Sequence, residues 1–91
     1  MIFQIYLKPK AQKDFNKLSS ELKKTFGKHF EKLAIKFRPK KHLKHGLPYF
    51  IEKVTDSARF PFEIEDNLLI IIRCFKNHKE YEDWFNSKKH L

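Results

Sequence analysis

Three apolar, β-prone segments lie close together in the second half of this 91-residue chain. They span residues 49–55, 58–65 and 68–75, and only Asp56-Ser57 and Asp66-Asn67 separate them. Turns of two residues connect antiparallel strands in β-hairpins. The sequence therefore predicts three consecutive antiparallel strands, which need a cover on at least one face of the sheet.

The first half of the chain supplies segments that can form this cover. A β-prone strand over residues 2–8 ends at Pro9, a residue that favours the first turn of a helix. Apolar residues then recur at helical spacing in two segments, the second of which is predicted to begin with Ser20 as N-cap and to end before Arg38-Pro39. A terminal helix over residues 80–88 completes the order β-α-α-β-β-β-α. We expect a single α+β domain over residues 1–91, with a helical hairpin on one face of a small antiparallel sheet.

The composition favours a packed domain that binds anions. Ten Phe residues predict an aromatic-rich core, and a net charge of +9 favours nucleic acid first and an acidic protein second. The longest apolar run, at residues 68–72, is too short to span a membrane, and the N-terminus does not resemble a signal peptide. Cys74 is the only cysteine and is expected to be buried and inert, which fits a cytoplasmic protein.

Two-residue turns would also determine the strand register. They pair Glu65 with Leu68 and Val54 with Arg59, and they place Glu52 opposite Pro61 and Arg59 opposite Cys74. The face covered by the helices would then hold Tyr49, Ile51, Phe60, Phe62, Ile64, Leu69, Ile71 and Phe75. The other face would hold Phe50, Glu52, Val54, Arg59, Ile70, Ile72, Cys74 and Lys76. Pro61 is expected to cause a bulge or a gap, and a bulge would shift the register by one residue.

This register predicts a polar patch on the sheet face opposite the helical hairpin. Glu52, Arg59 and Lys76 would lie on it, with His78 just past the last strand. A guanidinium binds phosphate oxygens with two N–H groups, and an imidazole exchanges protons near neutral pH. Such a patch can bind a phosphate and transfer protons, with Glu52 as a possible base.

Three stretches of the chain resemble the RelE/ParE toxin superfamily of type II toxin–antitoxin systems. They are Lys13-Asp14-Phe15-Asn16-Lys17-Leu18, Val54-Thr55-Asp56-Ser57-Ala58-Arg59-Phe60-Pro61-Phe62-Glu63-Ile64 and Asn77-His78-Lys79-Glu80-Tyr81. The last is similar to the His-x-x-Tyr-type ending of the HigB-like and YafQ-like branches. Phe60-Pro61-Phe62 departs from the usual aliphatic pair after the arginine, and Leu43-Lys44-His45-Gly46 departs from the common Lys-Leu-x-Gly form.

The resemblance, which covers nearly the whole chain, implies a toxin that cleaves mRNA in the ribosomal A site without a cofactor or a metal. The 2′-OH would attack the adjacent phosphate. Arg59 and Lys76 would bind this phosphate, and His78 would be the general acid or base. Tyr81 would stack on a base or orient His78, and Lys79 would hold the neighbouring RNA backbone. The resemblance also implies an acidic antitoxin that covers either the helical hairpin or an apolar patch of Phe50, Ile70 and Ile72.

Several alternatives remain open from the sequence. Lys40, Lys41, Lys44 and His45 belong to a basic loop that would contact RNA or simply be solvated, whereas His42 and His45 lack the further ligands of a zinc site. Trp84 and Phe85 are expected to pack on the sheet. A gyrase-poisoning or otherwise non-nucleolytic toxin of the ParE branch is one alternative function, and a degenerate toxin or basic RNA-binding module is another. His78 and Tyr81 favour the nuclease.

Overall fold

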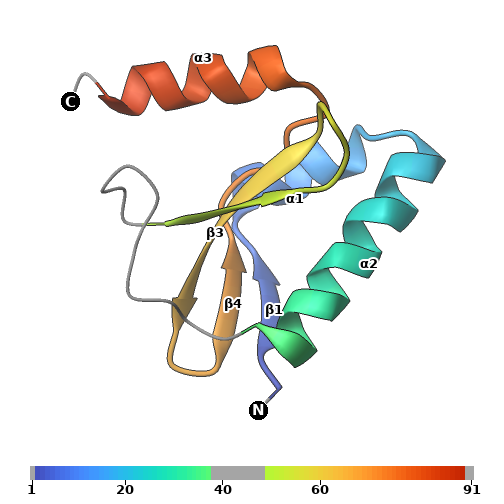
Figure 1. Ribbon diagram of the computed structural model, residues 1–91, viewed down its shortest axis with the longest axis vertical. Helices are drawn as coiled ribbons and strands as arrows, with labels where there is room; N and C mark the ends of the chain where they lie inside the picture. Colours follow the sequence, from blue (N-terminus) through green and yellow to red (C-terminus); the bar gives the residue numbers. More distant parts are fainter. Residues whose placement is uncertain (1, 38–48, 90–91) are drawn as a thin grey trace.

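The computed structural model describes residues 2–37 and 49–89, and the order of strands and helices in this part agrees with the prediction. The elements are β1 (Gln4–Leu7), α1 (Pro9–Asn16), α2 (Ser20–Lys36), β2 (Phe50–Lys53), β3 (Arg59–Glu65), β4 (Leu68–Ile71) and α3 (His78–Lys89). In Figure 1, α2 runs along the β1 side of the sheet, and α3 lies beyond the end at which β1 and β4 finish. None of the helices in the described ranges is long and apolar enough to cross a membrane.

The four strands form one sheet in the order β1-β4-β3-β2. β3 pairs with both neighbours in the antiparallel sense, as predicted, but β1 pairs with β4 in parallel, so the sheet is mixed. The reason lies in α2, whose Ala34 carbonyl accepts a hydrogen bond of 2.8 Å from Phe3 N–H at the start of β1. The end of α2 therefore lies beside the start of β1, and β2 runs in the same direction as β1. Because β2 and β4 are both antiparallel to β3, β4 also runs in the same direction as β1.

The α1–α2 hairpin covers one face of the sheet with aromatic side chains. α2 begins one residue earlier than predicted, because Ser19 is the N-cap and its hydroxyl accepts from Leu22 N–H at 3.2 Å. Phe60 is fully buried at the centre of the core, with ring centroids 4.9 Å from Phe30 and 5.9 Å from Phe26. The predicted aromatic core is therefore confirmed.

The register between β3 and β4 changes by one residue along the strands. Next to the turn, Glu65 pairs with Leu68 and Phe62 with Ile71, as predicted. At the other end, Arg59 forms an antiparallel bridge with Phe75, so its predicted pairing with Cys74 is wrong. The stretch between Ile71 and Phe75 thus holds one residue more than the stretch of β3 that it faces. A bulge was expected at Pro61, and one is present at this level of the sheet. The extra residue lies on the strand opposite Pro61, where Ile72 N–H donates to the Pro61 carbonyl at 2.9 Å.

The bulge reverses the predicted orientation of the residues that follow β4. Cys74 turns into the core beneath the helices, where burial raises the pKa of its thiol to about 12 and makes it inert. Phe75 turns to the opposite side, where its ring lies 5.6 Å from that of Trp84 on α3. The regular β-strand predicted over residues 68–75 consequently ends at Ile71.

The predicted register between β2 and β3 is also wrong by one residue. Lys53, not Val54, pairs with Arg59, and Glu52 pairs with Phe60. The connection contains residues 54–58, because the Thr55 hydroxyl accepts from the N–H groups of Ser57 and Ala58 at 3.2 and 2.9 Å. Phe50, Glu52 and Val54 therefore face the helices, and the predicted apolar patch of Phe50, Ile70 and Ile72 does not form.

Candidate functional site

Arg59, Phe75, His78 and Tyr81 come together on the side of the sheet that faces α3, and we call them the Arg59–Tyr81 cluster. Two backbone hydrogen bonds of 3.0 and 2.9 Å join Arg59 to Phe75, which sends both side chains to the same face. The Arg59 guanidinium carbon lies 5.4 Å from the centroid of the Tyr81 ring, at cation–π distance. The rings of Phe75 and His78 lie 6.0 and 6.2 Å from Tyr81. The structure thus brings together three residues that the sequence singles out.

Arg59 is half-buried and has unused hydrogen-bonding capacity. Its Nη2 donates to the Asp56 carbonyl at 3.0 Å, whereas its buried Nε has no partner. Within residues 2–37 and 49–89, no carboxylate forms an ion pair with Arg59. The two carboxylates on neighbouring strand positions have other partners: Glu52 contacts His29, and Glu63 contacts Lys8. A buried N–H without a partner is unfavourable, and an anionic oxygen would satisfy it. Arg59 is therefore suited to bind a phosphate.

Tyr81 and His78 differ in the proton chemistry open to them. Burial raises the pKa of Tyr81, and the charge of Arg59 offsets only part of this effect, so the phenol stays protonated at neutral pH. Tyr81 can thus donate a hydrogen bond or stack, but it is a poor base. His78 is exposed, with its Nε2 3.5 Å from a carboxylate oxygen of Glu82 one turn further along α3. His78 is therefore the member of the cluster suited to exchange protons with a ligand.

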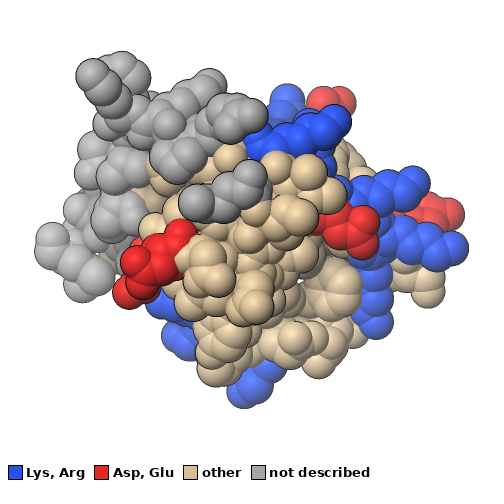
Figure 2. Space-filling view, turned by 90° about the horizontal axis from the view of Figure 1, so that it is seen from below, with Lys and Arg blue, Asp and Glu red and all other residues tan. Residues whose placement is uncertain are grey.

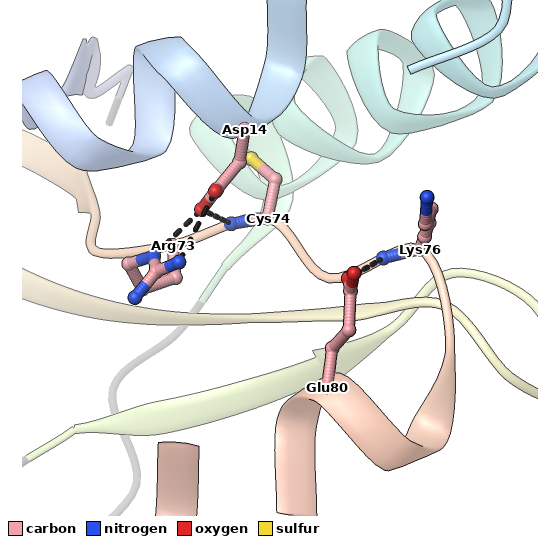
Figure 3. A network of polar contacts seen from close by, with 5 residues as sticks. All are labelled: Asp14, Arg73, Cys74, Lys76 and Glu80. Atoms are coloured by element: carbon pink, nitrogen blue, oxygen red, sulfur yellow. Dashed lines mark hydrogen bonds and ion pairs between the residues drawn. The ribbon is translucent and has the colours of Figure 1, made fainter. Parts of the chain in front are cut away.

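The first turn of α3 is held by a capping arrangement that the sequence interpretation missed. The Asn77 side-chain oxygen accepts from Glu80 N–H at 2.9 Å. The Glu80 carboxylate accepts from Lys76 N–H at 3.4 Å, as Figure 3 shows. As a result α3 begins at His78 and not at Glu80 as predicted. The Asn-x-x-Glu spacing is a known helix-start signal and was the pattern to recognise. These contacts fix where His78 and Tyr81 lie relative to the sheet.

The other residues predicted for the site are not brought into the cluster. Figure 3 shows the Lys76 side chain pointing away from Glu80, toward the side on which α1 and α2 lie, as the bulge dictates. Glu52 lies on the helix-covered face, where one carboxylate oxygen is 2.7 Å from His29 Nδ1. Lys79 is exposed on α3 and contacts Asp83 at 3.3 Å. The predicted RNA-binding residues Lys40, Lys41, Lys44 and His45 lie outside the described residues.

A second polar network, formed by Asp14, Arg73 and Cys74, supports the segment between β4 and α3 (Figure 3). The Asp14 carboxylate accepts from Arg73 Nε at 2.6 Å, from Arg73 Nη2 at 3.1 Å and from Cys74 N–H at 3.1 Å. The hydrogen bonds with Asp14 raise the pKa of Arg73 above its usual value. Asp14 thereby ties α1 to the bulge that turns Phe75 toward Arg59. The only sequence signal for this contact was a charged residue, Arg73, within an apolar run.

Replacing Asp14 with asparagine is expected to lower the free energy of unfolding by about 1–3 kcal/mol, because Arg73 and Cys74 N–H lose a charged acceptor away from bulk water. Urea unfolding of both proteins measures the difference. Asp83→Asn is the matched control, since its ion pair with Lys79 is exposed and we expect a loss below about 0.5 kcal/mol. Equal losses in the two variants would show that the Asp14 network does not stabilise the fold.

Within residues 2–37 and 49–89, no three His, Cys, Asp or Glu side chains come close enough together to hold a metal ion.

No model of a known protein family matches the sequence, and no curated protein matches it either. Comparison with solved structures, in contrast, finds clear similarity. The architecture is that of the RelE-like toxins of toxin–antitoxin pairs.

Three structures illustrate this similarity. A mutant of the toxin RelE from E. coli in the free state has a TM-score of 0.76 at 18% sequence identity, with 100% of each chain covered. A RelE mutant in complex with a peptide of the antitoxin RelBc has a TM-score of 0.71 at 16% identity, covering 92% of this chain and 95% of that one. The YoeB–YefM complex from Staphylococcus aureus has a TM-score of 0.60 at 17% identity, with 81% and 95% covered. The chain therefore has the RelE fold.

Proposed function

We propose that the protein is a RelE-type toxin that cleaves mRNA on the ribosome with the Arg59–Tyr81 cluster. The observation that carries the proposal is the half-buried Arg59, which has a buried Nε without a partner and no ion pair with any described carboxylate. It lies beside a phenol that stays protonated and a histidine that is exposed to solvent. The RelE fold makes RNA the first phosphate-containing ligand to consider.

The cluster can supply some of the groups that RNA cleavage by the internal 2′-OH requires, namely a cation for the phosphate and one group that transfers a proton. The 2′-oxygen forms a bond to phosphorus while the bond to the 5′-oxygen breaks, which leaves a 2′,3′-cyclic phosphate and a 5′-OH. Arg59 would stabilise the extra negative charge on the phosphate oxygens in the transition state. His78 would take the proton from the 2′-OH or deliver one to the 5′-oxygen. Tyr81 would stack on a base or donate to the phosphate.

Lys76 and Glu52 have no part in this version of the site. The Lys76 side chain points to the opposite side of the chain, and Glu52 lies beneath α2 with His29. Without them, the cluster contains one strong cation, Arg59, and one imidazole, His78. We infer that the ribosome, or the RNA itself, contributes the remaining groups, which would make cleavage of free RNA slow.

We also propose an acidic antitoxin as the partner of this toxin. The chain carries a net charge of +9, and the large apolar side chains that are exposed belong to β1, α2 and the residue at the start of the chain. Among the described residues these are Ile2, just before β1, with Ile5, Tyr6 and Ile35. Figure 2 shows a broad uncharged area on the lower face of the molecule, bordered by Lys and Arg side chains and by a few Asp and Glu side chains. Such a surface suits a partner with an apolar face and acidic flanks.

Cleavage of mRNA on purified translating ribosomes tests the proposed function. We expect wild-type protein to cut mRNA only when ribosomes are present, and His78→Ala to cut at least about tenfold more slowly, because it loses the group that transfers protons. Expression of the wild type should arrest growth. Arrest with intact mRNA and damaged DNA would support the gyrase-poisoning alternative instead. No arrest and no cleavage would leave the basic RNA-binding module.

A further inference from the structure

A cleft separate from the Arg59–Tyr81 cluster lies where the end of β1, the start of α1, the segment after β4 and helix α3 meet. It has a volume of about 560 Å³, which falls within the range of small-ligand sites. Its lining includes Lys8, Lys10, Arg73, Trp84 and Ser87, and none of the described residues that line it is acidic. The cleft is thus a positively charged recess with one large aromatic side chain.

The charge of the cleft is only partly balanced by neighbouring groups. Arg73 uses two of its five N–H donors for Asp14, and the others form no hydrogen bond with any residue in the described ranges. Lys8 Nζ lies 3.7 Å from the Glu63 carboxylate, but both side chains are exposed and such a pair is weak. Lys10 forms no ion pair with any residue in the described ranges. An anionic group in the cleft would therefore meet a favourable potential.

Trp84 connects this cleft to the Arg59–Tyr81 cluster. Its half-buried indole packs against Phe75 with ring centroids 5.6 Å apart, and Phe75 is the residue bridged to Arg59. The guanidinium carbon of Arg73 lies 5.2 Å from the centre of the Phe75 ring. Phe75 itself is buried, but the half-buried Tyr81 ring lies 5.4 Å from the Arg59 guanidinium carbon and 6.4 Å from the Trp84 ring. A ligand that extends from Arg59 over Tyr81 would thus reach Trp84 and the cations around it.

We propose that this cleft binds a nucleotide of single-stranded RNA next to the segment that the Arg59–Tyr81 cluster holds. Lys10, Lys8 and Arg73 supply the cations for a phosphate, and Trp84 supplies a surface on which a base can stack. An acidic peptide would use the cations but not the indole, so RNA accounts for more of the lining. The inference deepens the proposed function and rests on RNA as its ligand.

Fluorescence reports on this cleft directly, because Trp84 is the only tryptophan in the chain. The probe is a short single-stranded RNA with 2′-O-methyl groups, which lacks the attacking hydroxyl and stays intact. We expect the RNA to quench Trp84 and the dissociation constant to rise with salt concentration. Polyglutamate of equal charge is the comparison. Quenching by polyglutamate but not by RNA would overturn the proposal and assign the cleft to an acidic protein.

Lys10→Ala and Lys32→Ala form a matched pair of variants, since both lysines are exposed on helices and only Lys10 lines the cleft. Loss of one phosphate contact should weaken binding of single-stranded RNA about fivefold at 0.1 M salt and reduce the salt slope by about 0.7. We expect this for Lys10→Ala and no change for Lys32→Ala. An equal change in both variants would overturn the proposal.

The same variants separate this proposal from the proposed function. In the ribosome assay, Lys10→Ala should raise the KM for mRNA while kcat stays near the wild-type value, because the cleft binds RNA away from the reacting phosphate. Cleavage by the wild type without Trp84 quenching would overturn the cleft alone. Quenching that depends on Lys10, without any cleavage of mRNA, would support RNA binding by the cleft and contradict the proposed nuclease activity.

Discussion

Replacing Arg59 with alanine is expected to reduce ribosome-dependent mRNA cleavage by about 10²–10³-fold, the usual loss when one preorganised donor to a developing oxyanion is removed. The loss should appear in kcat, because the charge that Arg59 stabilises grows in the transition state. The free energy of unfolding should fall little, since the Arg59 side chain makes one hydrogen bond, to the Asp56 carbonyl, and no ion pair with any described residue. Single-turnover cleavage and urea unfolding measure the two quantities.

Arg59→Lys is the informative second variant. Lysine keeps the positive charge but loses the planar fork of donors that binds two phosphate oxygens at once. We expect cleavage by this variant to lie between that of Arg59→Ala and the wild type. Full activity in Arg59→Ala would show that another cation binds the phosphate, and Arg73, whose guanidinium also lies on the Phe75 ring, would be the first to examine.

Local patterns in the sequence were sufficient for the element order and for the content of the core. The helical spacing of Phe26, Phe30 and Leu33 predicts a buried face of α2, and all three side chains are buried. The Asp66-Asn67 turn gives the correct pairing of Glu65 with Leu68. Periodicity and short turns are local properties of the chain, so a single sequence is enough to identify them.

The face of Arg59 was predicted correctly, but those of Glu52 and Lys76 were not, because they depend on single-residue details of the connections. The Thr55 hydroxyl accepts from two backbone N–H groups and stabilises a five-residue loop, which moves Glu52 to the helix-covered face. The bulge after β4 does the same for Lys76. Since strand side chains alternate with a period of two, each one-residue change in register reverses the faces of all side chains on the strand that it displaces.

The network of Asp14 with Arg73 illustrates a different limit. These residues are 59 positions apart in the sequence, and neither lies in a pattern that links the two. Their contact forms only because the α1–α2 hairpin covers the sheet and the bulge brings Cys74 N–H toward α1. Long-range polar contacts of this kind follow from the tertiary structure and have no local signature.

Replacing Phe60 with alanine is expected to have the largest effect on stability, a loss of about 3–5 kcal/mol in the free energy of unfolding. Phe60 is fully buried and packs against the rings of Phe26, Phe30 and Phe62 at 4.9–5.9 Å, so truncation leaves a cavity that rigid neighbours cannot fill. A small domain has about 5–15 kcal/mol in total, so the variant should be close to unfolded. Guanidinium unfolding measures the loss.

Ile35→Ala is the control for this experiment, because Ile35 is 57% exposed on α2 and its truncation should change stability by less than about 0.5 kcal/mol. Similar losses in both variants would contradict the position of Phe60 at the centre of the core. Phe60→Leu retains most of the buried volume, and we expect it to remain folded. Phe60 and Arg59 are neighbours in β3 whose side chains point to opposite faces. Folded Phe60→Leu should therefore cleave mRNA like the wild type, whereas Arg59→Ala should be stable and cleave about 10²–10³-fold more slowly, which separates the core face of the sheet from its reactive face.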